Sequence, residues 1–155
     1  MKTTQDIYIT NGDSVSMAKF DFKGIDKYTE ALEKIGGKNA IAVCKYAIYP
    51  GASVVANAIR AEIESNHKDS GDLAKSLTLA NMRNDMGYIN TKIIFADYDR
   101  KGVANALKAA ALESGTSRGQ QATHFISRTV KAVADRAETE ISKALDQKIA
   151  EIMGE

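Results

Sequence analysis

The sequence predicts an α+β fold in which a small antiparallel β-sheet packs against one long kinked helix and a long C-terminal helix. Two long segments, 38–65 and 125–153, repeat apolar residues at the three- and four-residue spacing of an amphipathic helix. Two runs, 77–80 and 87–96, flank a turn-forming stretch at 84–87, and the second is rich in β-favouring residues, which indicates a hairpin. With 155 residues, 44% of them hydrophobic, the chain is long enough for one domain with a modest core.

The N-terminal part is predicted to contain a flexible arm, a strand and a short helix. Residues 1–14 are polar and end in a turn-forming Asn-Gly-Asp-Ser, so we expect an arm ahead of a single domain formed by residues 15–155. Residues 15–22 alternate approximately between apolar and polar side chains, which is typical of a half-buried strand. Residues 25–35 have apolar positions at helical spacing, and a Gly-Gly pair would end that helix.

The segment 38–65 is predicted to form one long helix in spite of Pro50, the only proline of the chain. Proline removes a backbone donor and crowds the carbonyl of Tyr46, four residues earlier, so we expect a kink. The apolar stripe keeps its phase on both sides of Pro50, which favours a bent helix over two separate ones. Cys44, the only cysteine, lies on this stripe and is interpreted as a small buried hydrophobe.

The middle of the chain is predicted to alternate short elements with polar loops. Residues 66–71 read as a loop and 73–77 as a turn or short helix ahead of the hairpin. Two aspartates in 97–102 resemble the start of a calcium loop, but the other ligands of that motif are missing, so we interpret the segment as a solvated connector. Residues 105–113 are alanine-rich, and the sequence leaves open whether they form a helix or an extended segment.

The stretch 112–125 joins this alanine-rich segment to the last helix. Gly115 can end a helix in the left-handed conformation, and Thr123 can serve as the N-cap of the helix that follows. The small and polar residues between them allow two interpretations. The stretch is either a polar connector that only aims the last helix, or a loop that docks on a neighbouring subunit.

Composition argues against several classes of protein. The formal net charge is +1, whereas a dedicated nucleic-acid binder normally has an excess of basic residues. The start of the chain lacks the apolar core of a signal peptide, and no apolar run approaches the ~18–20 residues that cross a bilayer. A single cysteine permits no intramolecular disulfide and fits a reducing compartment. We therefore expect a protein without a membrane partner, assembled in a cytoplasm.

The sequence contains no recognisable catalytic or metal-binding motif. Its two histidines, His67 and His124, lie in separate polar junctions without a second histidine or cysteine nearby. The serines around Gly115 lack the Gly-x-Ser-x-Gly frame of a nucleophile elbow, and no glycine loop follows a strand as a phosphate cradle would require. We expect no enzyme activity, no cofactor and no metal, with His67 in solvent.

Three stretches carry a family resemblance. The first reads Leu-Glu-Ser-Gly-Thr-Ser at 112–117 and Ala-Thr-His-Phe-Ile at 122–126, the second Ser-Gly-Asp-Leu-Ala-Lys-Ser-Leu at 70–77, and the third Phe-Asp-Phe-Lys-Gly-Ile-Asp at 20–26. In order and spacing they are similar to motifs of small tail-component or head–tail joining proteins of tailed bacteriophages and prophages. That family typically carries Glu-x-Gly-Thr-Ser before Ala-Arg-Pro-Phe-Leu, and Thr-Gly-x-Leu-x-x-Ser-Ile earlier in the chain.

The resemblance implies a structural virion protein that forms or joins a ring at the head–tail interface, in the neck or in tail completion. DNA would pass through the ring without sequence-specific binding, and the partners would be further copies of the chain and neighbouring connector or tail proteins. Residues implied at or near a subunit contact are Glu113, Thr116, Ser117 and Arg118. Residues implied to be structural are Gly71, Leu73, Ser76, Gly115 and Phe125.

Two other functions stay open at this point. One is a tail terminator or a tail-tube-associated protein of the same virion, which would differ in position and not in chemistry. The other is a cytoplasmic α+β adaptor or binding module unrelated to phages. Portal, capsid and tail genes next to this one would favour the virion functions.

Overall fold

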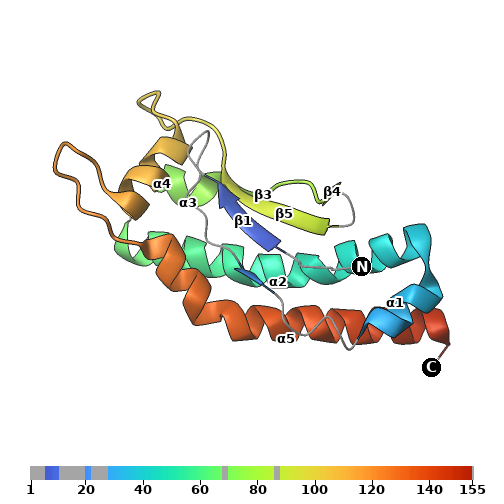
Figure 1. Ribbon diagram of the computed structural model, residues 1–155. Coiled ribbons are helices and arrows are strands. Elements are labelled where there is room, and N and C mark those ends of the chain that lie inside the picture. Colours follow the sequence, from blue (N-terminus) through green and yellow to red (C-terminus); the bar gives the residue numbers. More distant parts are fainter. Residues whose placement is uncertain (1–5, 11–19, 22–27, 68–69, 86–87, 155) are drawn as a thin grey trace.

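The computed structural model describes residues 6–10, 20–21, 28–67, 70–85 and 88–154. Helix α2 lies between a small sheet on one side and helix α5 on the other, and α3 and α4 lie together at one end (Figure 1). This arrangement confirms the predicted α+β class. The elements in chain order are β1 (Asp6–Thr10), β2 (Phe20–Asp21), α1 (Thr29–Ile35), α2 (Gly37–Asn66), α3 (Asp72–Ser76), β3 (Leu77–Leu79), β4 (Arg83–Asp85), β5 (Tyr88–Phe95), α4 (Asn105–Ser114) and α5 (Phe125–Met153).

The sheet is organised around β5. Along one edge of β5, β3 and β4 pair with it in antiparallel fashion, with Leu77 opposite Phe95 and Asp85 opposite Tyr88. The predicted hairpin is therefore confirmed. Along the other edge β1 pairs with β5 in parallel, and β2 pairs antiparallel with β1.

Strand β1 lies within the predicted N-terminal arm, which we expect to be flexible unless a partner or a sheet edge holds it. Asp6–Thr10 pairs with the edge of β5, and because this pairing is parallel, the complete sheet is mixed and not purely antiparallel as predicted. The physical reason is visible in the sequence Ile-Tyr-Ile-Thr at 7–10, since β-branched and aromatic residues favour strands. Of the predicted strand 15–22, only Phe20 and Asp21 belong to the described residues, and they form β2.

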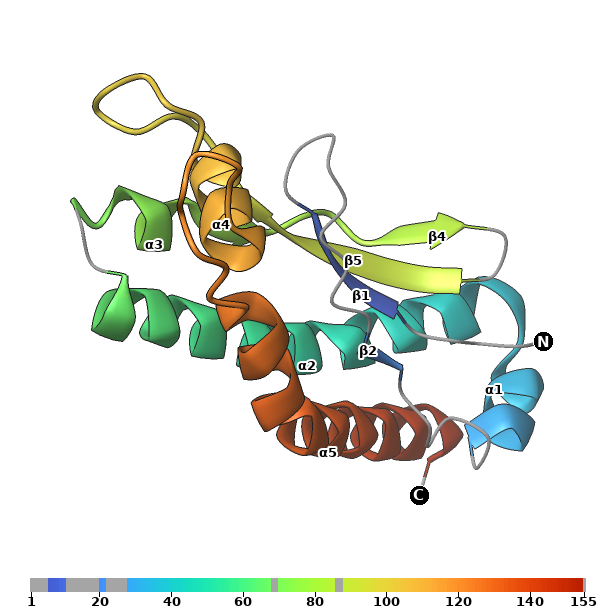
Figure 2. The same cartoon turned by 60° about the vertical axis from the view of Figure 1, so that its left-hand side comes forward.

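Helix α2 runs from Gly37 to Asn66 without interruption, so the prediction of one element across Pro50 is confirmed. Figures 1 and 2 show a clear bend in the first turns of α5. No helix among the described residues combines the length and the apolar composition that crossing a bilayer requires.

Helices α2 and α5 approach each other closely because small residues line their contact. Gly51, next to Pro50, is buried, and a Cβ added there would lie 2.5 Å from Cγ1 of Ile141 and 3.1 Å from the carbonyl oxygen of Ala137. Large apolar side chains fill the core on both sides of this crossing. The largest fully buried ones are Phe125, Ile48, Ile59, Ile63, Ile93, Ile126, Ile141, Leu145, Val43 and Val55.

At the end opposite α3 and α4, α1 joins the C-terminal half of α5. Gly36 ends α1 with φ 69° and leads directly into α2, as the Gly-Gly pair predicts. The hydroxyl of Tyr28 donates to Oδ1 of Asp146 at 2.7 Å, and the carbonyl oxygen of Ser142 lies 3.2 Å from the same hydroxyl as an alternative acceptor. These contacts hold the start of α1 against α5.

Candidate functional site

The connector between α4 and α5, residues 115–124, projects from the body of the molecule (Figures 1 and 2). Gly115 ends α4 with φ 75°, and the N–H of Thr116 donates to the carbonyl of Gln120 at 2.9 Å. The backbone doubles back so closely that a Cβ on Gly115 would lie 2.7 Å from that carbonyl oxygen and 2.9 Å from the amide nitrogen of Ala122. Both the positive φ and this approach give a physical reason for the structural role predicted for Gly115.

Glu113, in the last turn of α4, holds the beginning of α5. Its side chain is buried, with the residue 2% exposed. Oε2 accepts a hydrogen bond from the N–H of Ile126 at 2.8 Å, and Oε1 accepts from the N–H of Ser127 at 3.2 Å and from the Ser127 hydroxyl. These amides lie in the first turn of α5, where they have no carbonyl partner within the helix, and the helix dipole also favours a carboxylate there.

This arrangement gives Glu113 a role inside its own subunit. Its carboxylate is buried and hydrogen-bonded to α5, and its position at or near a subunit contact stays a prediction. Glu113 therefore acts as an internal cap of α5. The other three residues predicted at a contact, Thr116, Ser117 and Arg118, are all exposed on the connector, and their contact with a partner stays a prediction.

Thr123 is not the N-cap that the sequence predicts. Its hydroxyl and its N–H both donate to the carbonyl of Leu112, at 2.7 Å and 2.8 Å. His124 occupies the N-cap position of α5 in the left-handed conformation (φ 50°), and its N–H donates to the carbonyl of Glu113 at 3.1 Å. Thr123 and His124 thus tie the returning end of the connector to the end of α4, and the capping falls to Glu113.

Phe125 and His67 join α5 to the end of α2. Phe125 is fully buried, and its ring centroid lies 5.0 Å from that of His67 at an interplanar angle of 54°. His67 is predicted to lie in solvent, but it is partly buried, and among the described residues its Nε2 has no hydrogen-bond partner. The prediction is wrong because the apolar partner of His67 comes from a distant part of the chain.

The segment 97–102, predicted to be a solvated connector, is built around a buried aspartate. Asp99 is 8% exposed. Its Oδ1 accepts hydrogen bonds from the N–H of Val103 (2.8 Å) and of Lys101 (2.9 Å), and its Oδ2 pairs with Nζ of Lys108 on α4. The hydrogen bond from Lys108, followed by those from the backbone of Val103 and Lys101, lowers the pKa of Asp99 to about 2.

The sequence leaves open whether residues 105–113 are helical or extended, and the structure shows that they belong to helix α4. The first residue of α4 is held by hydrogen bonds of its own side chain. Asn105 is buried, and its Nδ2 donates to the carbonyls of Ala96 (3.1 Å) and Asp97 (3.3 Å) at the end of β5. Together with Asp99 and Lys108, these bonds fix α4 against the sheet.

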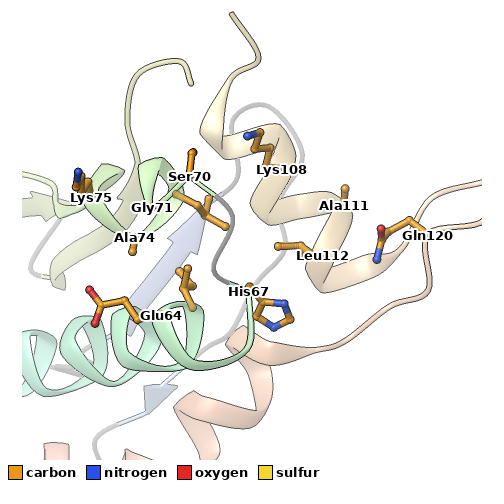
Figure 3. Close-up of a pocket in the computed structure, with 12 residues that line it drawn as sticks. Glu64, His67, Ser70, Gly71, Ala74, Lys75, Lys108, Ala111, Leu112 and Gln120 are labelled. Atoms are coloured by element: carbon orange, nitrogen blue, oxygen red, sulfur yellow. The ribbon is translucent and has the colours of Figure 1, made fainter. Parts of the chain in front are cut away.

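A cavity of about 620 Å³ lies between the end of α2, α3, α4 and the connector, as Figure 3 shows. Its lining is apolar in part and carries several polar side chains. The two stretches 70–77 and 112–126, which carry the family resemblance, both contribute to it. The lining residues are Ile63, Glu64, His67, Ser70, Gly71, Leu73, Ala74, Lys75, Lys108, Ala111, Leu112 and Gln120.

Of the residues in and before α3 that are predicted to be structural, Gly71 and Leu73 line this cavity. Gly71 precedes α3 with φ 82°, a left-handed conformation that favours glycine. Leu73 and Ser76 are buried, and the hydroxyl of Ser76 donates to the carbonyl of Leu73 at 2.7 Å. These contacts agree with a structural role for all three residues.

Exposed apolar side chains lie close to the same end of the molecule. Tyr98 is 72% exposed and Leu107 is 64% exposed, and a backbone bridge between Tyr98 and Ala104 fixes the loop that leads into α4. The exposure of Tyr98 and Leu107 could not be predicted from the sequence, because single exposed apolar residues produce no periodic pattern.

Within the described residues, no three side chains of the His, Cys, Asp and Glu types are grouped so that they could hold a metal ion. Comparison of the chain with protein-family models, with curated proteins and with solved structures finds no match.

Proposed function

We propose that this chain is a structural virion protein of a tailed bacteriophage or prophage that forms or joins a ring at the head–tail interface, through which DNA passes. The observation that supports the proposal most strongly is spatial. The stretches 70–77 and 112–126 resemble two separate motifs of such proteins, and both contribute residues to one cavity; the second stretch also contains the projecting connector. Residues that serve a common contact are expected to meet in this way.

The connector also has properties that suit a protein contact. Its exposed tip carries Thr116, Ser117 and Arg118. At its base, the Glu113 carboxylate accepts hydrogen bonds from the start of α5, and the hydroxyl of Thr123 donates to the end of α4. A loop held in one conformation loses less conformational entropy when it binds than a loose one. The connector can therefore dock without a large ordering cost.

A charge reversal at the tip and a change at the base test the proposal. We expect the purified protein, alone or with its connector and tail partners, to form rings in mass photometry and negative-stain images. Arg118→Glu should weaken assembly and leave thermal stability unchanged, because Arg118 is exposed. Gly115→Val should lower thermal stability together with assembly, because an added Cβ would be strained at φ 75° and would lie 2.7 Å from the carbonyl oxygen of Gln120.

The matched control is Lys143→Glu, an equal charge reversal at an exposed position 18 residues after the first residue of α5, about 27 Å along the helix at ~1.5 Å per residue. Equal effects of Lys143→Glu and Arg118→Glu would remove the connector from the proposal. Absence of any assembly, with or without the virion partners, would contradict the proposed function as a whole.

A further inference from the structure

We draw no further inference here: the strongest candidate, the exposed groove between α2 and α5 that Tyr46 and Tyr49 line, carries none because nothing in the structure shows what covers it.

Discussion

The middle of the α2–α5 contact and the end formed by α3, α4 and the connector are held together by different interactions. The contact between the long helices consists of buried aliphatic side chains and small residues, with Gly51 against Ile141 at the closest approach. The other end depends on buried polar groups. Glu113 and Asn105 bind backbone groups of a neighbouring segment, and Asp99 binds the backbone of its own loop and the side chain of Lys108 on α4. The comparison shows that apolar packing builds the body of this fold, whereas directed hydrogen bonds position the part that presents the connector and the cavity.

Removal of apolar volume from the first region should have the largest effect. Ile141 is buried and packs against Gly51, so Ile141→Ala leaves a cavity between the long helices. We expect a loss of about 2–5 kcal/mol in the free energy of unfolding, measured by urea denaturation. Lys131→Ala, at an exposed position of the same helix, should change it by less than about 0.5 kcal/mol. A similar loss in both variants would contradict the role given to this contact.

Removal of the internal cap should have a smaller and more local effect. Glu113→Ala leaves the first amides of α5 without their acceptor, and we expect a loss of about 1.5–3 kcal/mol in unfolding free energy. Glu113→Gln keeps one carbonyl oxygen as an acceptor and should lose less. Hydrogen exchange should show faster opening of the connector and the first turn of α5, with α2 protected as before. Uniform acceleration along the chain would show that the two regions are not separable.

Acid titration of Asp99 should have the smallest effect. Its pKa is lowered from 3.8 to about 2 in the folded protein, chiefly by the hydrogen bond from Lys108. A carboxyl group with a depressed folded pKa stabilises the protein above the unfolded pKa and loses this contribution as pH falls through the folded value. The contribution of Asp99 should therefore disappear between about pH 4 and pH 2. Asp99→Asn should lack this part of the pH dependence in melting experiments; an identical slope in both proteins would argue against the assignment.

The same contrast explains which parts of the structure could be predicted from the sequence. Periodicity gave the long helices and the hairpin, because apolar spacing directly reflects the face that each element buries. It could not identify Glu113 as a cap of α5 or Asp99 as a buried anchor, because a charged residue next to a loop reads as exposed unless its distant partners are known. Strand β1 was missed because Ile7–Thr10 is short and its partner β5 lies far along the chain.

In the candidate site, too, features marked by a local sequence pattern could be predicted, and features that depend on distant segments could not. The residues at the tip, Thr116, Ser117 and Arg118, lie in a stretch that the sequence predicts to be a polar loop, because small polar residues between glycines form turns, and the structure leaves them exposed. The cavity was not predicted, because it needs the end of α2, α3, α4 and the connector to converge. No local pattern in any one of these segments signals a concave surface.

The attachment of the connector has a mechanical consequence. Thr123 and His124 donate hydrogen bonds to the end of α4. Glu113, at that same end, accepts a hydrogen bond from the first turn of α5. The base of the connector is therefore fixed to both α4 and α5. A force applied at its tip should move α5 and should not be taken up by a change in the backbone conformation of the loop. A displacement at one end of the subunit would then be carried along α5 toward the other.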